Sequence, residues 1–185
     1  MALTYTPAGE LGSRLPDFIL PSVDGKSISS VDLCQNKKAL VVMFICNHCP
    51  YVKAIEDRLI QLAHDLGKKG AAFVAICSND PTEYPEDAPA ELRKRWRDKN
   101  YGFPYLVDAD QSVAKAFGAV CTPDIFVYDN QQALCYRGRL DDSWRDPQKV
   151  SHQELRLAVE AVLAGKTPSR DQNPSMGCSI KWKTS

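Results

Sequence analysis

The amino-acid sequence predicts an α/β fold in which helices pack on both faces of a mixed sheet. Apolar runs of strand length alternate with amphipathic segments of helical period through most of the 185 residues. Near the C-terminal end, two strand-like runs are separated only by Asn-Gln-Gln, as in a β-hairpin. Alternating strands and helices favour parallel pairing, whereas a hairpin is antiparallel, so we expect both kinds of pairing in one sheet.

The expected elements begin with an N-terminal strand and hairpin extension, because residues 17–21 and 26–33 flank the turn-forming Gly25. Residues 39–45 (ALVVMFI) form an apolar run rich in β-branched side chains, typical of a strand covered on both faces. Further strands are expected at 71–78, 105–110, 124–129 and 133–140, and helices at 52–66, 88–100, 111–120 and 151–166. The chain shows no repeat or linker, so we expect a single domain over 1–185, with a core at about 14–165 and a C-terminal tail at 166–185.

Charge and cysteine content narrow the function classes. Lys and Arg total 23, as do Asp and Glu, so no net positive charge attracts nucleic acid or an anionic membrane. The N-terminal segment lacks a signal-peptide pattern, and no window approaches the roughly 18 apolar residues of a membrane span. Seven cysteines are an odd number for a structural disulfide framework. We therefore expect a cytoplasmic protein with mostly reduced thiols, in which any paired cysteines are redox-active.

The stretch FICNHCPYV, residues 44–52, places Cys46 and Cys49 between the apolar strand and an amphipathic helix. In open α/β sheets, reactive groups lie at the carboxyl ends of the strands. A helix N-terminus stabilises a thiolate because its first N–H groups have no partner, and we expect Cys46 to occupy that cap position. The pattern predicts a dithiol site.

In this site, Cys46 is the expected nucleophile, and Cys49, one helical turn later, is the expected resolving thiol. His48 lies between them, and its protonated ring would stabilise the Cys46 thiolate. The chemistry requires no metal or organic cofactor, because electrons arrive from another thiol.

Three stretches, CNHCPYV, LVDADQSVAKAFGAVCTPDIFVYD and YRGRLDDS, resemble the thioredoxin-fold superfamily. The chain is most similar to the peroxiredoxin-like proteins of the alkyl hydroperoxide reductase and thiol-specific antioxidant (redoxin) group that carry a CxxC. The resemblance implies a thioredoxin-like α/β/α sandwich with a central mixed sheet. It also implies a cis-proline at Pro123 facing the CxxC, so that Thr122 and Pro123 bound the substrate groove and Cys121 lies close by.

Two departures from the family pattern affect the chemistry. Typical thioredoxins have Trp directly before the first cysteine and a buried Asp six residues before it; here those positions hold Ile45 and Leu40. The usual base for the resolving cysteine is therefore absent, and His48 or a later residue is the candidate replacement. Peroxiredoxins have Thr or Ser three residues before the peroxide-reactive cysteine, whereas Cys46 stands three before Cys49 and Met43 three before Cys46.

The leading interpretation is a cytosolic thiol-disulfide oxidoreductase. Its expected partners are a protein or small-molecule thiol or disulfide substrate and a reducing dithiol protein, with no nucleic acid and no membrane. One alternative is a thiol-dependent peroxidase, and another is a Cu or Zn binding or delivery protein that uses the CxxC with His48, Cys121 or Cys178. A non-catalytic interaction module is the third. Cys178 lies in a tail without strand or helix pattern, and it is either an additional redox cysteine that swings to the site or a thiol without a role.

Overall fold

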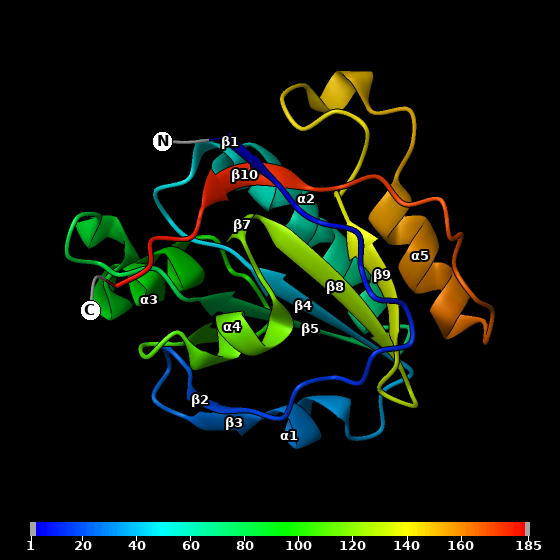
Figure 1. The fold of residues 1–185 in the computed structure, drawn as a ribbon, viewed down its shortest axis with the longest axis horizontal. Helices are drawn as coiled ribbons and strands as arrows, with labels where there is room; N and C mark the ends of the chain where they lie inside the picture. Colours follow the sequence, from blue (N-terminus) through cyan, green and yellow to red (C-terminus); the bar gives the residue numbers. More distant parts are fainter. Residues whose placement is uncertain (1–2, 184–185) are drawn as a thin grey trace.

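Strand β4 (Ala39–Phe44) is the centre of the fold in the computed structural model, which describes residues 3–183 (Figure 1). β4 pairs in parallel with β5 (Ala71–Cys77) and antiparallel with β8 (Asp124–Asp129). β6 (Tyr105–Val107) and β9 (Leu134–Gly138) complete a five-stranded sheet in the order β6-β5-β4-β8-β9. The predicted mixed sheet is confirmed.

Helices cover both faces of this sheet. On one face, α2 (Pro50–Gly67) packs against α5 (Glu154–Leu163). On the other face lie α1 (Ser30–Cys34) and α4 (Ser112–Phe117), while α3 (Pro89–Asp98) contacts β6 near the sheet edge. The predicted α/β/α sandwich is therefore confirmed. None of the helices in the described part of the chain is long and apolar enough to cross a membrane.

The side chains of β4 alternate between two hydrophobic cores. Val41 and Met43 belong to the core beneath α2 and α5, whereas Val42 and Phe44 belong to the core beneath α1 and α4. Because successive side chains of a strand point to opposite faces, a strand between two helical layers must be apolar throughout. This requirement explains the uninterrupted hydrophobic run in the sequence.

The expected N-terminal hairpin is present as β2 (Ile19–Pro21) and β3 (Ser27–Ser29). Gly25 lies in the connecting turn with φ of 93°, a conformation that favours glycine. The hairpin lies with α1 along one side of the molecule (Figure 1). Two short 3-10 helices, η1 (Pro85–Asp87) and η2 (Pro147–Lys149), interrupt the loops.

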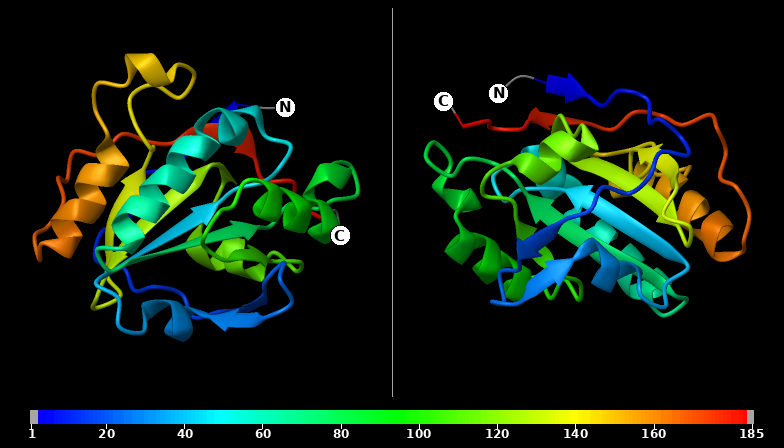
Figure 2. Two further views of the ribbon diagram at one scale, coloured as in Figure 1. Left: turned by 180° about the vertical axis from the view of Figure 1, so that it is seen from behind. Right: turned by 60° about the horizontal axis from the view of Figure 1, so that its bottom comes forward.

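A second, three-stranded sheet joins the two ends of the chain. β1 (Leu3–Tyr5) pairs with β10 (Met176–Ser179), and β10 pairs with β7 (Cys121–Thr122). Figure 2 shows β1 in blue and β10 in red running side by side. The expectation of a tail without strand structure was wrong, because Met-Gly-Cys-Ser has no alternating pattern and becomes a strand by pairing with two distant segments.

Asp124 and Arg137 form a buried ion pair between β8 and β9. Arg137 Nη2 lies 2.8 Å from Asp124 Oδ2, and the exposed fractions of the two side chains are 7% and 0%. Burial raises the pKa of Asp124, although Arg137 opposes that rise. Arg137 also donates to the Gly118 carbonyl at 2.8 Å. The positive charge of Arg137 therefore compensates the buried negative charge of the Asp124 carboxylate.

We expect Arg137→Met to lower the free energy of unfolding by about 3–5 kcal/mol, because the change leaves the Asp124 carboxylate buried without its partner. Urea denaturation followed by circular dichroism measures the loss. The matched control is Arg93→Met on α3, where the exposed side chain predicts a change within about 0.5 kcal/mol. Equal stability of the two variants would contradict the assignment of a structural role to this pair.

Candidate functional site

The two cysteines of the CxxC lie between the end of β4 and the start of α2, at the carboxyl edge of the sheet. The prediction that Cys46 caps the helix was wrong, since α2 begins at Pro50 and its N-cap is Cys49. Proline is favoured at the first helical position, because its fixed φ suits a helix and its missing N–H needs no partner there. Cys46 instead lies in the loop before the helix, three residues upstream of the cap.

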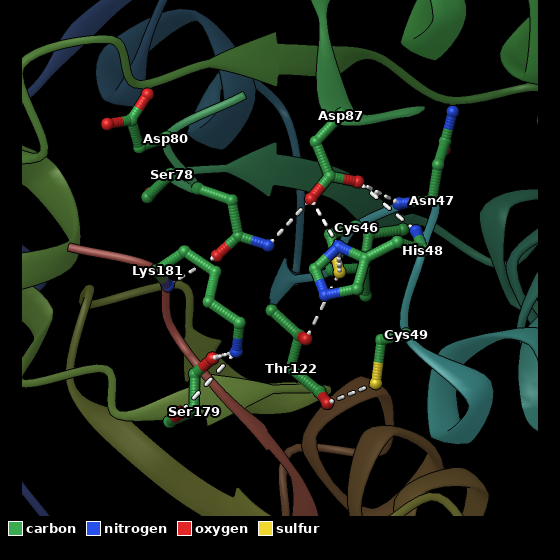
Figure 3. A network of polar contacts seen from close by, with 12 residues as sticks. Cys46, Asn47, His48, Cys49, Ser78, Asp80, Asp87, Thr122, Ser179 and Lys181 are labelled. Carbon is green, nitrogen blue, oxygen red and sulfur yellow. Dashed lines mark hydrogen bonds and ion pairs between the residues drawn. The ribbon is translucent and has the colours of Figure 1, made fainter. Parts of the chain in front are cut away.

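Cys46 is almost fully buried, with 1% of its surface exposed. Its Sγ lies 3.3 Å from Thr122 Oγ1 and 3.6 Å from His48 Nδ1 (Figure 3). Burial raises the pKa of the Cys46 thiol well above its usual value, and hydrogen bonding to Cys49 and the negative charge of Asp87 raise it further. Cys46 is therefore the protonated member of the reduced pair.

Cys49 is fully buried, yet its surroundings favour the thiolate. Hydrogen bonding from Cys46 lowers the pKa of Cys49 to about 5 against the effect of burial, and the backbone N–H of Val52 and the thiol of Cys178 also lower it. Cys49 Sγ lies 3.1 Å from the Thr122 carbonyl oxygen, which accepts from the protonated thiol and so opposes ionisation. Cys49 is the N-cap of α2, and the thiols of Cys46 and Cys178 and the N–H of Val52 all donate to its sulfur. Together these donors outweigh the effect of the Thr122 carbonyl on the Cys49 pKa.

His48 is fixed by a buried carboxylate. Its Nδ1 lies 2.6 Å from Asp87 Oδ2, and its ring stacks on Tyr84 with centroids 4.0 Å apart. The other Asp87 oxygen accepts from the backbone N–H groups of Asn47 (2.8 Å) and His48 (3.2 Å), and Asn79 Nδ2 donates to Oδ2 at 2.8 Å. Asp87 therefore holds the loop between the two cysteines as well as the imidazole (Figure 3).

The charge of Asp87 is retained in this environment. Burial raises the pKa of its carboxyl, but the hydrogen bonds from His48 and Asn79 outweigh burial, so the net pKa is lowered. The ligand atoms of Cys46, His48 and Asp87 all lie within 4.8 Å of one another. The same three side chains thus form a hydrogen-bonded row and a set of donors that could hold a metal ion.

The peptide bond between Thr122 and Pro123 is cis, as the resemblance implied. Thr122 contacts both sulfurs of the CxxC, through its hydroxyl to Cys46 and its carbonyl to Cys49. Side chains alternate along a strand, so Cys121 faces away from Thr122; its Sγ contacts the Pro123 carbonyl at 3.5 Å. The structure thus brings Thr122 and Pro123 to the pair, and a groove role for Cys121 stays a prediction.

Cys178 lies in strand β10, opposite Thr122 in the pairing of β10 with β7. Its thiol interacts with Cys49, and burial followed by this hydrogen bond raises the pKa of Cys178 to about 12. The tail cysteine is thus brought to the site by pairing between strands.

A pocket of about 400 Å³ adjoins the cis-proline. Tyr51 of α2, Pro123 and Trp144 line it, and the rings of Tyr51 and Trp144 lie 4.5 Å apart. A larger pocket of about 530 Å³ includes His64 and Ala71, at the opposite edge of the sheet from the cysteines. Of these two pockets, the one beside Pro123 adjoins the thiol site.

Asp87 and Asn79 were not among the predicted site residues. The position of Asn79 could have indicated it, since Asn79 follows β5 at the same carboxyl edge of the sheet as the CxxC. Asp87 had none, because it lies in a 3-10 helix between two prolines, 39 positions from the histidine that it binds.

A pH titration of thiolate ultraviolet absorbance in the reduced protein should show a transition at about pH 5 that Cys49→Ala removes. Cys46→Ala should raise the midpoint, because Cys46 is the largest stabiliser of the anion. A depressed pKa stabilises the folded state above the unfolded thiol pKa of about 8.5, and this contribution disappears as pH falls through 5. A single transition near 8.5 in the wild type would contradict the assignment.

A model of the AhpC/TSA family matches residues 11–137. Among curated protein sequences, none is similar enough to count as a match. A crystal structure of an uncharacterized conserved protein from Geobacillus kaustophilus is 44% identical, with a TM-score of 0.94, over 100% of this chain and 98% of that chain. A hypothetical protein from Sinorhizobium meliloti 1021 is 42% identical, with a TM-score of 0.93, over 98% of this chain and 100% of that chain.

A more distant likeness concerns the fold alone. A secreted Mycobacterium tuberculosis disulfide oxidoreductase, described as homologous to E. coli DsbE, shares 17% identity and a TM-score of 0.58, over 80% of this chain and 95% of that chain. The family match covers more than half of the residues, and the neighbours share the architecture described above. The chain therefore belongs to the AhpC/TSA family and has the thioredoxin fold.

Proposed function

We propose that the protein is a thiol-disulfide oxidoreductase whose redox-active pair is Cys46 and Cys49. The observation that carries this proposal is the position of both thiols between β4 and α2, against a threonine whose hydroxyl contacts one sulfur and whose carbonyl contacts the other. A thiolate of the pair attacks a substrate disulfide and releases one substrate thiol. The second cysteine then attacks the mixed disulfide and releases the other, so the substrate gains the two electrons that the pair loses.

The order of the two cysteines is part of the proposal. The sequence assigns attack to Cys46 and resolution to Cys49. The depressed pKa of Cys49 and the raised pKa of Cys46 favour the reverse order in the reduced protein. Trapping of the mixed disulfide distinguishes these two assignments.

His48 and Asp87 supply the proton chemistry in this proposal. The positions that carry the usual thioredoxin residues are buried and apolar, with Leu40 at 1% and Ile45 at 2% exposure. His48 Nδ1 lies 3.6 Å from Cys46 Sγ but donates its proton to Asp87, so proton exchange with the pair requires the imidazole to release that hydrogen bond first. Asp87 is a positioning residue, because it binds the imidazole and reaches the Cys46 sulfur by its charge alone, without contact.

The substrate in this proposal is a protein or small-molecule disulfide that enters beside Pro123, where the pocket walls of Tyr51 and Trp144 offer apolar contact. A reducing dithiol protein returns the electrons to the pair. The absence of a net charge, with 23 basic and 23 acidic residues, agrees with a thiol partner more than with nucleic acid. We place the protein in the cytoplasm, where reductants keep such a pair reduced.

Thiol-dependent peroxide reduction is a second candidate, favoured by the AhpC/TSA family match. The cysteine three residues before Cys49 replaces the Thr or Ser of the peroxidase pattern, and this departure ranks the candidate second. Stopped-flow oxidation by hydrogen peroxide decides between the two, since a rate no greater than that of a free thiol rules out a peroxidase.

Metal binding is a third candidate, favoured by the closeness of Cys46, His48 and Asp87. A cysteine sulfur, an imidazole nitrogen and a carboxylate oxygen are donors that suit zinc. Elemental analysis of protein purified without chelator separates metal binding from the redox proposal, which requires no metal.

Cys49→Ser, and Cys46→Ser with Cys178→Ser added, should each reduce the turnover of a model disulfide to the rate of an ordinary thiol, because each leaves no second thiol beside the reactive one. If Cys46 attacks, Cys49→Ser accumulates the mixed disulfide. If Cys49 attacks, the mixed disulfide accumulates in Cys46→Ser with Cys178→Ser added, since Cys178 contacts the same sulfur. Wild-type turnover in both the Cys49→Ser variant and the double variant would overturn the proposal; mass spectrometry without reductant identifies the trapped species.

His48→Ala should slow disulfide exchange by roughly 100-fold, the lower end of what a positioned acid-base group contributes. Asp87→Asn should also slow disulfide exchange, and it should flatten the pH dependence of the rate. The loss of a purely structural contact would not flatten that dependence. His152→Ala is the matched control, because His152 is exposed. Equal rates for His48→Ala and His152→Ala would remove the imidazole from the mechanism.

A further inference from the structure

The C-terminal strand β10 lies along the edge of β7, directly beside the cis-proline. In the antiparallel register, Cys178 lies opposite Thr122 and Ser179 opposite Cys121. An exposed strand edge is a template for pairing with another chain, and extended peptides bind proteins in this way. Here the tail of the same chain fills that edge (Figure 2), and it places a third cysteine, Cys178, next to Cys49.

Gly177 permits the close approach of this strand. A Cβ atom at Gly177 would lie 1.9 Å from the Thr122 carbonyl oxygen and 3.0 Å from Pro123 Cδ. No side chain fits at that distance, so only glycine lets β10 lie against the backbone at the cis-proline. The close approach brings the next residue, Cys178, to Cys49.

The strand is held on both sides of Cys178. Before it, Ser175 Oγ donates to the Pro123 carbonyl at 2.8 Å. After it, the Lys181 N–H donates to Asn79 Oδ1 at 2.9 Å, and Asn79 is the side chain that also binds Asp87. The tail thiol is therefore positioned by the same polar network that fixes His48. A pre-positioned thiol reacts at an advantage, because the entropy of bringing the groups together is already lost in folding.

Cys49 thus has two cysteine neighbours. Both Cys46 and Cys178 hydrogen-bond to its sulfur in the reduced protein. A disulfide exchanges when a thiol attacks one of its sulfurs and displaces the other. Once Cys46 and Cys49 are joined, Cys178 is the neighbouring thiol that can attack Cys49.

We propose that Cys178 is a third redox cysteine, which exchanges with the Cys46–Cys49 disulfide at Cys49. This inference rests on the proposed redox function of the CxxC. The Cys178 sulfur forms a bond to Cys49, the Cys46–Cys49 bond breaks, and Cys46 leaves as a thiolate. The proton of Cys178 passes to Cys46, beside which His48 lies, so no external oxidant or reductant is consumed.

The exchange has a structural consequence. A Cys49–Cys178 disulfide joins the N-cap of α2 to β10 and fixes the tail on the edge of β7. In the reduced protein the tail is held there by hydrogen bonds and by burial of Cys178 and Ile180 in the two cores, without a covalent bond. The oxidation state of Cys49 thereby controls how firmly the strand edge beside Pro123 is closed.

The test uses Cys46→Ser treated with oxidised glutathione, followed by acid quenching, alkylation and mass spectrometry of peptides without reduction. Cys49 first forms a mixed disulfide with one glutathione and releases the other. We expect Cys178 to displace the bound glutathione and leave a Cys49–Cys178 disulfide with two hydrogens lost. With Cys178→Ser added, the glutathione adduct on Cys49 should persist, whereas Cys135→Ser, the matched control on β9, should leave the Cys49–Cys178 product unchanged.

A second variant, Gly177→Val, retains Cys178 but displaces β10 from Thr122, so the Cys49–Cys178 product should fall to the level of the Cys178→Ser variant. A persistent adduct in Cys46→Ser, together with a normal Cys46–Cys49 disulfide in the wild type, would overturn the role of Cys178 and leave the proposed function intact. Failure of the wild type to form a Cys46–Cys49 disulfide would instead overturn the proposed function.

Discussion

Strand β4 is buried on both faces, and this burial determines where polar and reactive groups can lie. The strand is paired with β5 and β8, and its side chains alternate between two cores, so every position from Ala39 to Phe44 must be apolar. A polar base at Leu40 would enter the core without compensation. The reactive groups therefore lie beyond the carboxyl end of the strand, in the loop that leads to α2.

Asp87 organises this loop at an energetic cost that its partners offset. A buried carboxylate is tolerated when donors satisfy it, and four donors from Asn47, His48 and Asn79 converge on its two oxygens. The same Asn79 binds the backbone of Lys181. One polar network thus connects the CxxC loop, the end of β5 and the C-terminal tail.

The tail gives this thioredoxin fold a closed edge beside its cysteines. With β10 in place, Cys46 and Cys49 expose 1% and 0% of their surface. A buried thiol pair reacts with small or locally inserted partners, or after a movement of the strand that covers it. Cys178 lies against Cys49, so the strand that covers the pair also supplies the thiol that we propose exchanges with it.

Local patterns in the sequence are enough to predict the layers of the fold. The apolar run at 39–45, the helical periods and the turn at Gly25 are local patterns, and the strands and helices that they predict formed near their predicted places, although α1 (Ser30–Cys34) lies in a segment expected as strand or turn. Local patterns also located the CxxC, and the family resemblance located the cis-proline. The contact of Asp87 with His48 and the approach of β10, which brings Cys178 to Cys49, depend on the tertiary structure. These contacts join segments far apart in the chain, and their short sequences carry no periodic signal, so only packing of the complete fold defines them.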